Sequence, residues 1–147
     1  MLSHSFRRLL VVTACAALLG AGCGGGGGGT ERYREDLTEA KEKFDTILEQ
    51  AAQPGRTPDQ LMGDLGRLRR GIAEFKGELA KLDPPAEAEN EQKAVDEALA
   101  EYDSAVGSTT AAVQAEDRDA VAAEVARVQT TGAALDRALE TLVAAVD

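Results

Sequence analysis

Apolar side chains recur in steps of three and four along four stretches of the chain, and this pattern constrains the fold most. Such spacing places the apolar residues of each stretch on one face of an α-helix. The stretches are separated by turn or breaker signals, which are Pro54-Gly55, Asp83-Pro84-Pro85 and Asp117. The sequence therefore predicts helices over about residues 31–52, 58–82, 86–114 and 118–146.

The apolar stripes also predict how the helices pair, because facing residues of an antiparallel hairpin have numbers with a constant sum. The facing pairs of the second hairpin add up to 234 and include Tyr102 with Gly132, where a ring has a gap opposite it. Those of the first hairpin add up to 112 and include Phe44 with Leu68. We therefore expect an all-α fold, an antiparallel up-down-up-down four-helix bundle made of two αα-hairpins.

The first 23 residues have the organisation of a bacterial export signal. Arg7 and Arg8 precede the apolar run Leu9–Leu19, which is too short to span a membrane. Gly20-Ala21-Gly22 and then Cys23 follow. The segment LLGAGC resembles the lipobox of bacterial lipoproteins, in which the cysteine thiol receives diacylglycerol. In the usual pattern Leu or Val stands three residues before the cysteine, and here that position is Gly20.

This resemblance implies a division of the chain into three parts. Residues 1–22 form a signal peptide that is removed by cleavage between Gly22 and Cys23. Residues 23–29 form a lipidated Cys23 and a poly-Gly tether that spans about 13 Å, and residues 30–147 form the bundle. The layout is similar to that of small surface lipoproteins of high-GC Gram-positive bacteria, which implies a lipid-anchored protein on the extracytoplasmic face of the cell membrane.

Two other interpretations of the N-terminal segment remain open. In the first, the segment is an ordinary secretory signal that is cleaved near Ala21, and Cys23 is an incidental thiol. In the second, which concerns the export route alone, Arg7 and Arg8 belong to a twin-arginine signal rather than a general secretory one.

The reactive side chains of the expected mature protein are few. His4 and Cys15 leave with the signal peptide and Cys23 carries lipid, so neither histidine nor a free thiol remains. The usual pairs of nucleophile and general base are then absent, and Met62 alone does not make a haem or copper site. We expect no enzyme activity, no metal and no cofactor other than the acyl lipid. A pI of 4.6 also argues against a nucleic-acid partner.

Acidic residues gather where the third and fourth helices are expected to begin. Glu87, Glu89 and Glu91 precede or open one helix, and Asp117 and Asp119 open the other. Carboxylates are favoured there by the helix dipole. The alternative is calcium binding, although neither cluster has the spacing of a calcium-binding loop.

The one basic cluster, Arg67, Arg69 and Arg70, also has two interpretations. It is a solvated flank of the second helix, paired with Asp64 and Glu74 at helical spacing, or it contacts anionic lipid or a cell-wall polymer.

Small and polar residues interrupt three of the expected helices. In the second helix, glycines indicate either tolerated small residues or the close approach of a neighbour, and they are Gly63, Gly66, Gly71 and Gly77. In the third and fourth helices they indicate either a kinked, loosely packed helix or a small polar groove, and they are Ser104, Gly107, Ser108, Thr109, Thr110, Thr130, Thr131 and Gly132.

Together these features predict a non-catalytic helical bundle that holds or contacts another component of the cell envelope, either a protein or the cell wall. The alternative is a lipoprotein that binds a small ligand or calcium.

Overall fold

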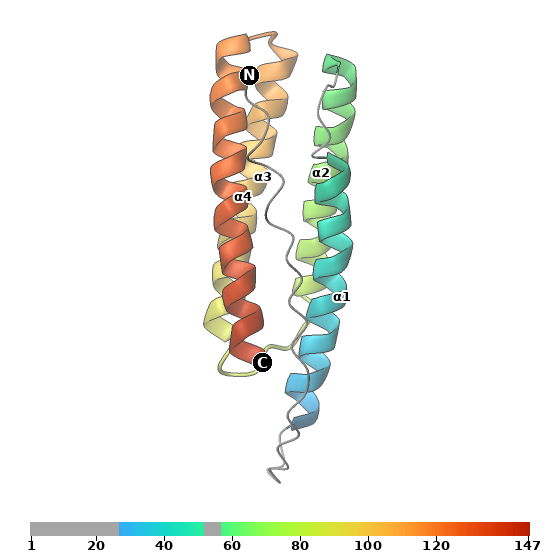
Figure 1. The fold of residues 1–147 in the computed structure, drawn as a ribbon, viewed down its shortest axis with the longest axis vertical. Helices are drawn as coiled ribbons and strands as arrows, with labels where there is room; N and C mark the ends of the chain where they lie inside the picture. Colours follow the sequence, from blue (N-terminus) through green and yellow to red (C-terminus); the bar gives the residue numbers. More distant parts are fainter. Residues whose placement is uncertain (1–26, 52–56) are drawn as a thin grey trace, which may run out of the picture.

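A computed structural model describes residues 27–51 and 57–147 of the chain. In these residues it contains four helices and no strand: α1 (Gly27–Ala51), α2 (Pro58–Leu79), α3 (Glu89–Gln114) and α4 (Arg118–Val146). The helices run alternately up and down, and each packs against the next, with α4 beside α1 (Figure 1). The predicted all-α four-helix bundle is confirmed.

Two of the predicted helix starts are confirmed by their capping hydrogen bonds. The Thr57 hydroxyl accepts from the backbone N–H of Gln60, whose side chain accepts in return from the Thr57 N–H, and Pro58 occupies the first helical position. At the start of α4 the Asp117 carboxylate accepts from the Ala120 N–H at 3.0 Å.

The other helix ends differ from the predicted ones by a few residues. α1 begins at Gly27, so Gly27–Gly29 are helical and do not belong to the predicted tether. α2 ends at Leu79, because the N–H groups of Lys81 and Leu82 bond three residues back and tighten the last turn before Pro84. α3 then begins at Glu89, three residues later than predicted.

The hairpin of α3 and α4 has the predicted register. A Cβ atom added at Gly132 would lie 3.4 Å from Cε2 of Tyr102, so the ring of Tyr102 packs over this glycine. The pair adds up to 234, as expected from the sequence.

The hairpin of α1 and α2 has a different register from the predicted one. Phe44 stacks on Phe75, with ring centroids 4.7 Å apart and an interplanar angle of 4°, and Ile47 lies against Gly71. These pairs add up to 119 and 118 rather than 112, so the prediction that Phe44 faces Leu68 is wrong. The difference is one heptad, and it displaces α1 by about 10 Å along the bundle axis.

The repeat of the apolar stripe explains why the sequence did not fix this register. Leu37 and Phe44 are seven residues apart, so a shift of one heptad buries nearly the same face of α1. The observed register adds the stacked rings of Phe44 and Phe75, and it places Ile47 where only a glycine leaves room for it.

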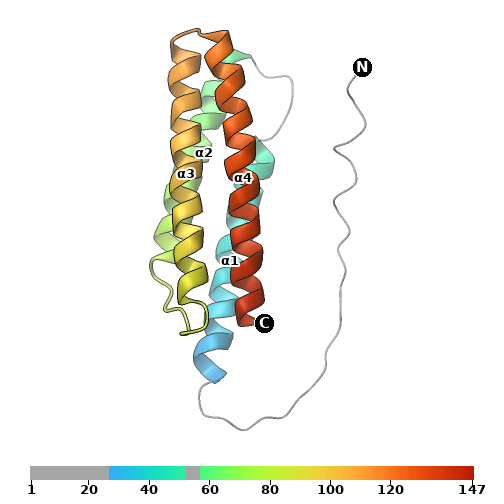
Figure 2. The same cartoon turned by 90° about the vertical axis from the view of Figure 1, so that its left-hand side faces the viewer.

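Because of this shift, α1 stops well below the end of the bundle at which α4 begins (Figures 1 and 2). Arg34 lies 3.9 Å from Asp147, which sets the level of α1 beside α4. Because facing residues of two antiparallel helices have numbers with a constant sum, Ala51 then lies level with residue 130, about 18 Å below the start of α4. Among the described residues, one end of the bundle therefore consists of three helices instead of four.

The apolar stripe of α4 is buried only where α1 accompanies it. The buried residues of α4 are Leu135, Leu139, Leu142 and Val146. In the first half of the helix Val121 and Val128 are half-buried, and Val125 is 38% exposed. The apolar stripe of α4 is thus only partly buried, because α1 does not reach its first half.

At the opposite end a short polar chain joins three helices. The Tyr33 hydroxyl donates to Oε1 of Gln92 at 2.6 Å, and Nε2 of Gln92 donates to the Leu79 carbonyl at 3.3 Å. Tyr33 is 3% exposed. The chain therefore ties the first half of α1 to the start of α3 and the end of α2.

Candidate functional site

The residues predicted to carry the lipid and the cleavage site, Gly22 and Cys23, lie outside the described residues, as does the whole predicted signal peptide.

The basic cluster on α2 is paired partly as predicted. Arg67 forms an ion pair with Asp64, one turn earlier, and Asp64 is 2% exposed. Pairing along the helix does not extend to Arg69, because its Nε donates to Oδ1 of Asp103 on α3 at 3.2 Å. This bridge between two helices depends on their relative position, which the spacing along α2 does not encode.

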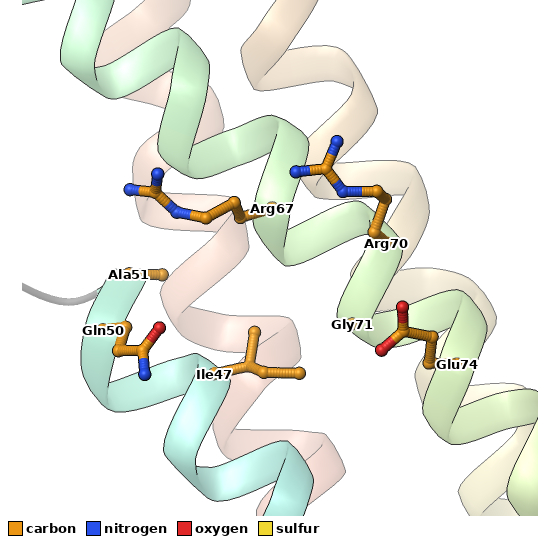
Figure 3. A pocket seen from close by; sticks show the side chains of 7 residues that line it. All are labelled: Ile47, Gln50, Ala51, Arg67, Arg70, Gly71 and Glu74. Atoms are coloured by element: carbon orange, nitrogen blue, oxygen red, sulfur yellow. The ribbon is translucent and has the colours of Figure 1, made fainter.

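A small hollow lies beside the cluster, between the end of α1 and the middle of α2 (Figure 3). We call it the arginine pocket. Its volume is about 170 Å³, and it is lined by Ile47, Gln50, Ala51, Arg67, Arg70, Gly71 and Glu74.

The wall of the arginine pocket exists because residue 71 is a glycine. A Cβ atom there would lie 2.8 Å from both Cδ1 and Cγ2 of Ile47, which is closer than carbon atoms pack. Added Cβ atoms at Gly63, Gly66 and Gly77 would meet nothing within 4 Å. The close approach of a neighbouring helix therefore explains Gly71, and the other three glycines of α2 are unconstrained by packing.

The charged groups that line the arginine pocket are two guanidinium groups and one carboxylate. Figure 3 shows the Arg70 guanidinium directed away from the Glu74 carboxylate, and the predicted pair between them is not formed in the described structure. A guanidinium group carries hydrogen-bond donors and no acceptor, so Arg67 and Arg70 can donate hydrogen bonds to an anionic group.

The threonine hydroxyls in the polar stretches of α3 and α4 bond to carbonyls of their own helices. The hydroxyls of Thr109, Thr110 and Thr130 each donate to the carbonyl four residues earlier, at 2.9 to 3.0 Å. Thr109 is 1% exposed, and Gly132 receives the Tyr102 ring. These contacts give the threonines and Gly132 structural roles, and both helices run through this region uninterrupted.

The acidic helix starts are held in structural roles. Asp117 caps α4, while Glu89, Glu91 and Asp119 lie in first turns, where the helix dipole favours them. In the described ranges no group of three or more histidine, cysteine, aspartate or glutamate side chains is arranged to hold a metal ion.

Burial is the main cause of a raised pKa in three described groups. Burial raises the pKa of Tyr33 to about 12, with a smaller contribution from Asp96. Burial and then Asp136 raise the pKa of Tyr102 to about 12. Burial also raises the pKa of Asp136, and the charge of Asp45 on α1 raises it further while Lys41 opposes the shift. None of the three lines the arginine pocket.

No protein family, curated protein or solved structure matches the chain. Within residues 27–51 and 57–147, no helix is both long and apolar enough to cross a membrane.

Proposed function

We propose that this protein is a lipoprotein anchored through Cys23, whose helical bundle acts without catalysis as a binding or structural component of the cell envelope. The observation that carries the proposal is the position of Cys23. It comes directly after Gly20-Ala21-Gly22 and an apolar run that is too short to span a membrane.

The position of α1 in the chain supports an upright arrangement on the membrane. Three residues, Gly24–Gly26, separate Cys23 from the start of α1, so the two are at most about 14 Å apart. α1 itself is about 37 Å long. A lipid on Cys23 would therefore hold the first turn of α1 near the headgroups and leave the far end of the bundle accessible to other envelope components.

The arginine pocket lies far from the proposed anchor. Arg67 and Arg70 are beside the last turns of α1, about 35 Å from Gly27. In the upright arrangement these side chains contact an envelope protein or a cell-wall polymer rather than the lipid headgroups of the same membrane, and a weak anionic ligand fits their chemistry.

The experiment that tests the anchor compares the wild type with two cysteine variants. Mass spectrometry of the protein from its native membrane should give an acylated Cys23 as the first residue, and the protein should enter the detergent phase on Triton X-114 separation. Cys23→Ser should stay in the aqueous phase or retain its leader. Cys15→Ser is the matched control, because that cysteine leaves with the signal peptide, and it should behave as the wild type does. An unmodified Cys23 thiol in the wild type would overturn the proposal.

A further inference from the structure

The end of the bundle that α1 does not reach carries a groove lined mainly by apolar side chains, which we call the apical groove. It lies between the first turn of α2, the last turn of α3 and the first turns of α4, and has a volume of about 830 Å³. Its apolar lining consists of Leu61, Met62, Val113, Val121 and Ala122. The exposed Val125 follows Val121 by one turn on the same face of α4.

The burial of these side chains is incomplete even in the folded chain. Leu61, Met62, Val113 and Val121 are half-buried, whereas the corresponding stripe at the other end of α4 is fully buried. In a four-helix bundle such a stripe is covered by the fourth helix. In the described residues α1 ends at Ala51, so it does not cover the 12 residues of α4 above residue 130, a length of about three turns.

The rim of the apical groove is acidic. Asp59 and Glu116 line it together with Arg118, and Asp117 and Asp119 are exposed beside it. Among these five described charges four are negative. A second copy of the chain would bring the same acidic end and be repelled, whereas Lys or Arg residues beside an apolar face would be attracted.

We propose that the apical groove binds an amphipathic helix of another protein, about three turns long, with an apolar face flanked by basic residues. The helix lies in the groove along the first turns of α4, beside the first turn of α2 and the last turn of α3. Its apolar residues cover Val121 and Val125, and its basic residues face Asp59 and Glu116. This inference specifies the partner in the proposed binding role, but it does not depend on the lipid anchor.

The test uses the full chain in a neutral detergent and a defined probe. The probe is an amidated 14-residue peptide of Leu and Lys with an amphipathic helical pattern, and the same pattern with Glu in place of Lys is the charge control. Binding is measured by fluorescence anisotropy of the labelled peptide, and the site is mapped through the methyl signals of ¹³C-labelled Val and Met. The Lys peptide should bind saturably, weaken as salt is added, and shift the methyl signals of Met62, Val121 and Val125.

Two double variants with the same added charge distinguish binding in the groove from attraction to the overall negative charge of the protein. Val121→Lys/Val125→Lys should weaken binding of the Lys peptide at least about tenfold, a factor that corresponds to 1.4 kcal/mol. Ala123→Lys/Ala126→Lys adds two lysines on the exposed outer face of α4 and should change the affinity less than about twofold. All four positions are half-buried or exposed, and helical content by circular dichroism verifies that both variants fold.

Four outcomes would overturn the inference. They are equal weakening by the two double variants, equal binding of the Glu peptide, methyl shifts confined to other parts of the bundle, and a stable dimer through Val125 in sedimentation experiments without peptide. None of these outcomes bears on acylation of Cys23, so failure here is distinguishable from failure of the anchor.

Discussion

Replacing Gly71 by alanine should destabilise the protein, although the same change at other glycines of α2 should stabilise it. An alanine in a helix interior is favoured over glycine by about 1 kcal/mol. At Gly71 the new methyl group would lie 2.8 Å from two carbons of Ile47. Overpacking of this kind costs about 1–3 kcal/mol, so the net change is a loss of up to about 2 kcal/mol of unfolding free energy.

The matched controls lie on the same helix. Gly63→Ala, Gly66→Ala and Gly77→Ala would place a methyl group where nothing lies within 4 Å, so each should gain about 0.5–1 kcal/mol. Urea unfolding followed by circular dichroism at 222 nm measures all four variants, and a thermal scan should show Gly71→Ala melting several degrees below each control.

A double-mutant cycle then tests the cause of the difference. Ile47→Ala removes both carbons that meet the new methyl group, so Gly71→Ala should cost less in that background than in the wild type, with a coupling of about 1–3 kcal/mol. If Gly71→Ala stabilises the protein as much as Gly66→Ala does, or if the cycle shows no coupling, then the close approach of α1 to α2 at this point is not as described.

Three further predictions concern titratable and polar groups. The raised pKa of Asp136 means that its charged form is disfavoured in the folded state, so its contribution to stability rises as pH falls through the folded pKa. Asp136→Asn should therefore raise Tm at pH 7. The difference in Tm from the wild type should vanish at a pH below the unfolded pKa. Tyr33→Phe leaves Oε1 of Gln92 without its donor and should cost about 1–2 kcal/mol in urea unfolding, and a cost near zero would contradict the bridging role. Because the pKa values of Tyr33 and Tyr102 are raised in the folded state, both phenols should contribute stability that is complete below pH 10 and is lost towards pH 12. Absorbance at 295 nm should show both phenols ionising near pH 12 in the folded protein, and titration near pH 10 would refute their burial.

The fold was accessible from the sequence because helix signals are local. Two helix starts are marked by capping side chains, Thr57 and Asp117, which bond to backbone N–H groups only three residues away. Pro58 marks the first helical position of α2. The pairing of Tyr102 with Gly132 was also accessible, since a large side chain opposite the smallest one marks a specific register within a repeating stripe.

The register of the first hairpin was not accessible from the stripe alone, because apolar residues seven positions apart are interchangeable in it. Complementary sizes carry the missing information: Ile47 with Gly71, and the two rings of Phe44 and Phe75, agree on one register. The positions of the candidate sites depend on this register as well. The arginine pocket forms where α1 ends beside Arg67 and Arg70, and the apical groove forms above that end, so neither follows from the sequence until the register is known.

The contact of Ile47 with Gly71 would have a mechanical consequence under the proposed anchor at Cys23. A pull along α1 from that side acts parallel to the helix axis, so it loads the hairpin in shear rather than peeling one helix from the other. Ile47 packs against Gly71, which has no side chain. To slide along α2 towards the N-terminal end of α1, Ile47 would have to pass the bulkier Phe75 side chain one turn further along α2. The contact at Gly71 would thus resist sliding of α1 along α2 if the chain were pulled from an anchor at Cys23.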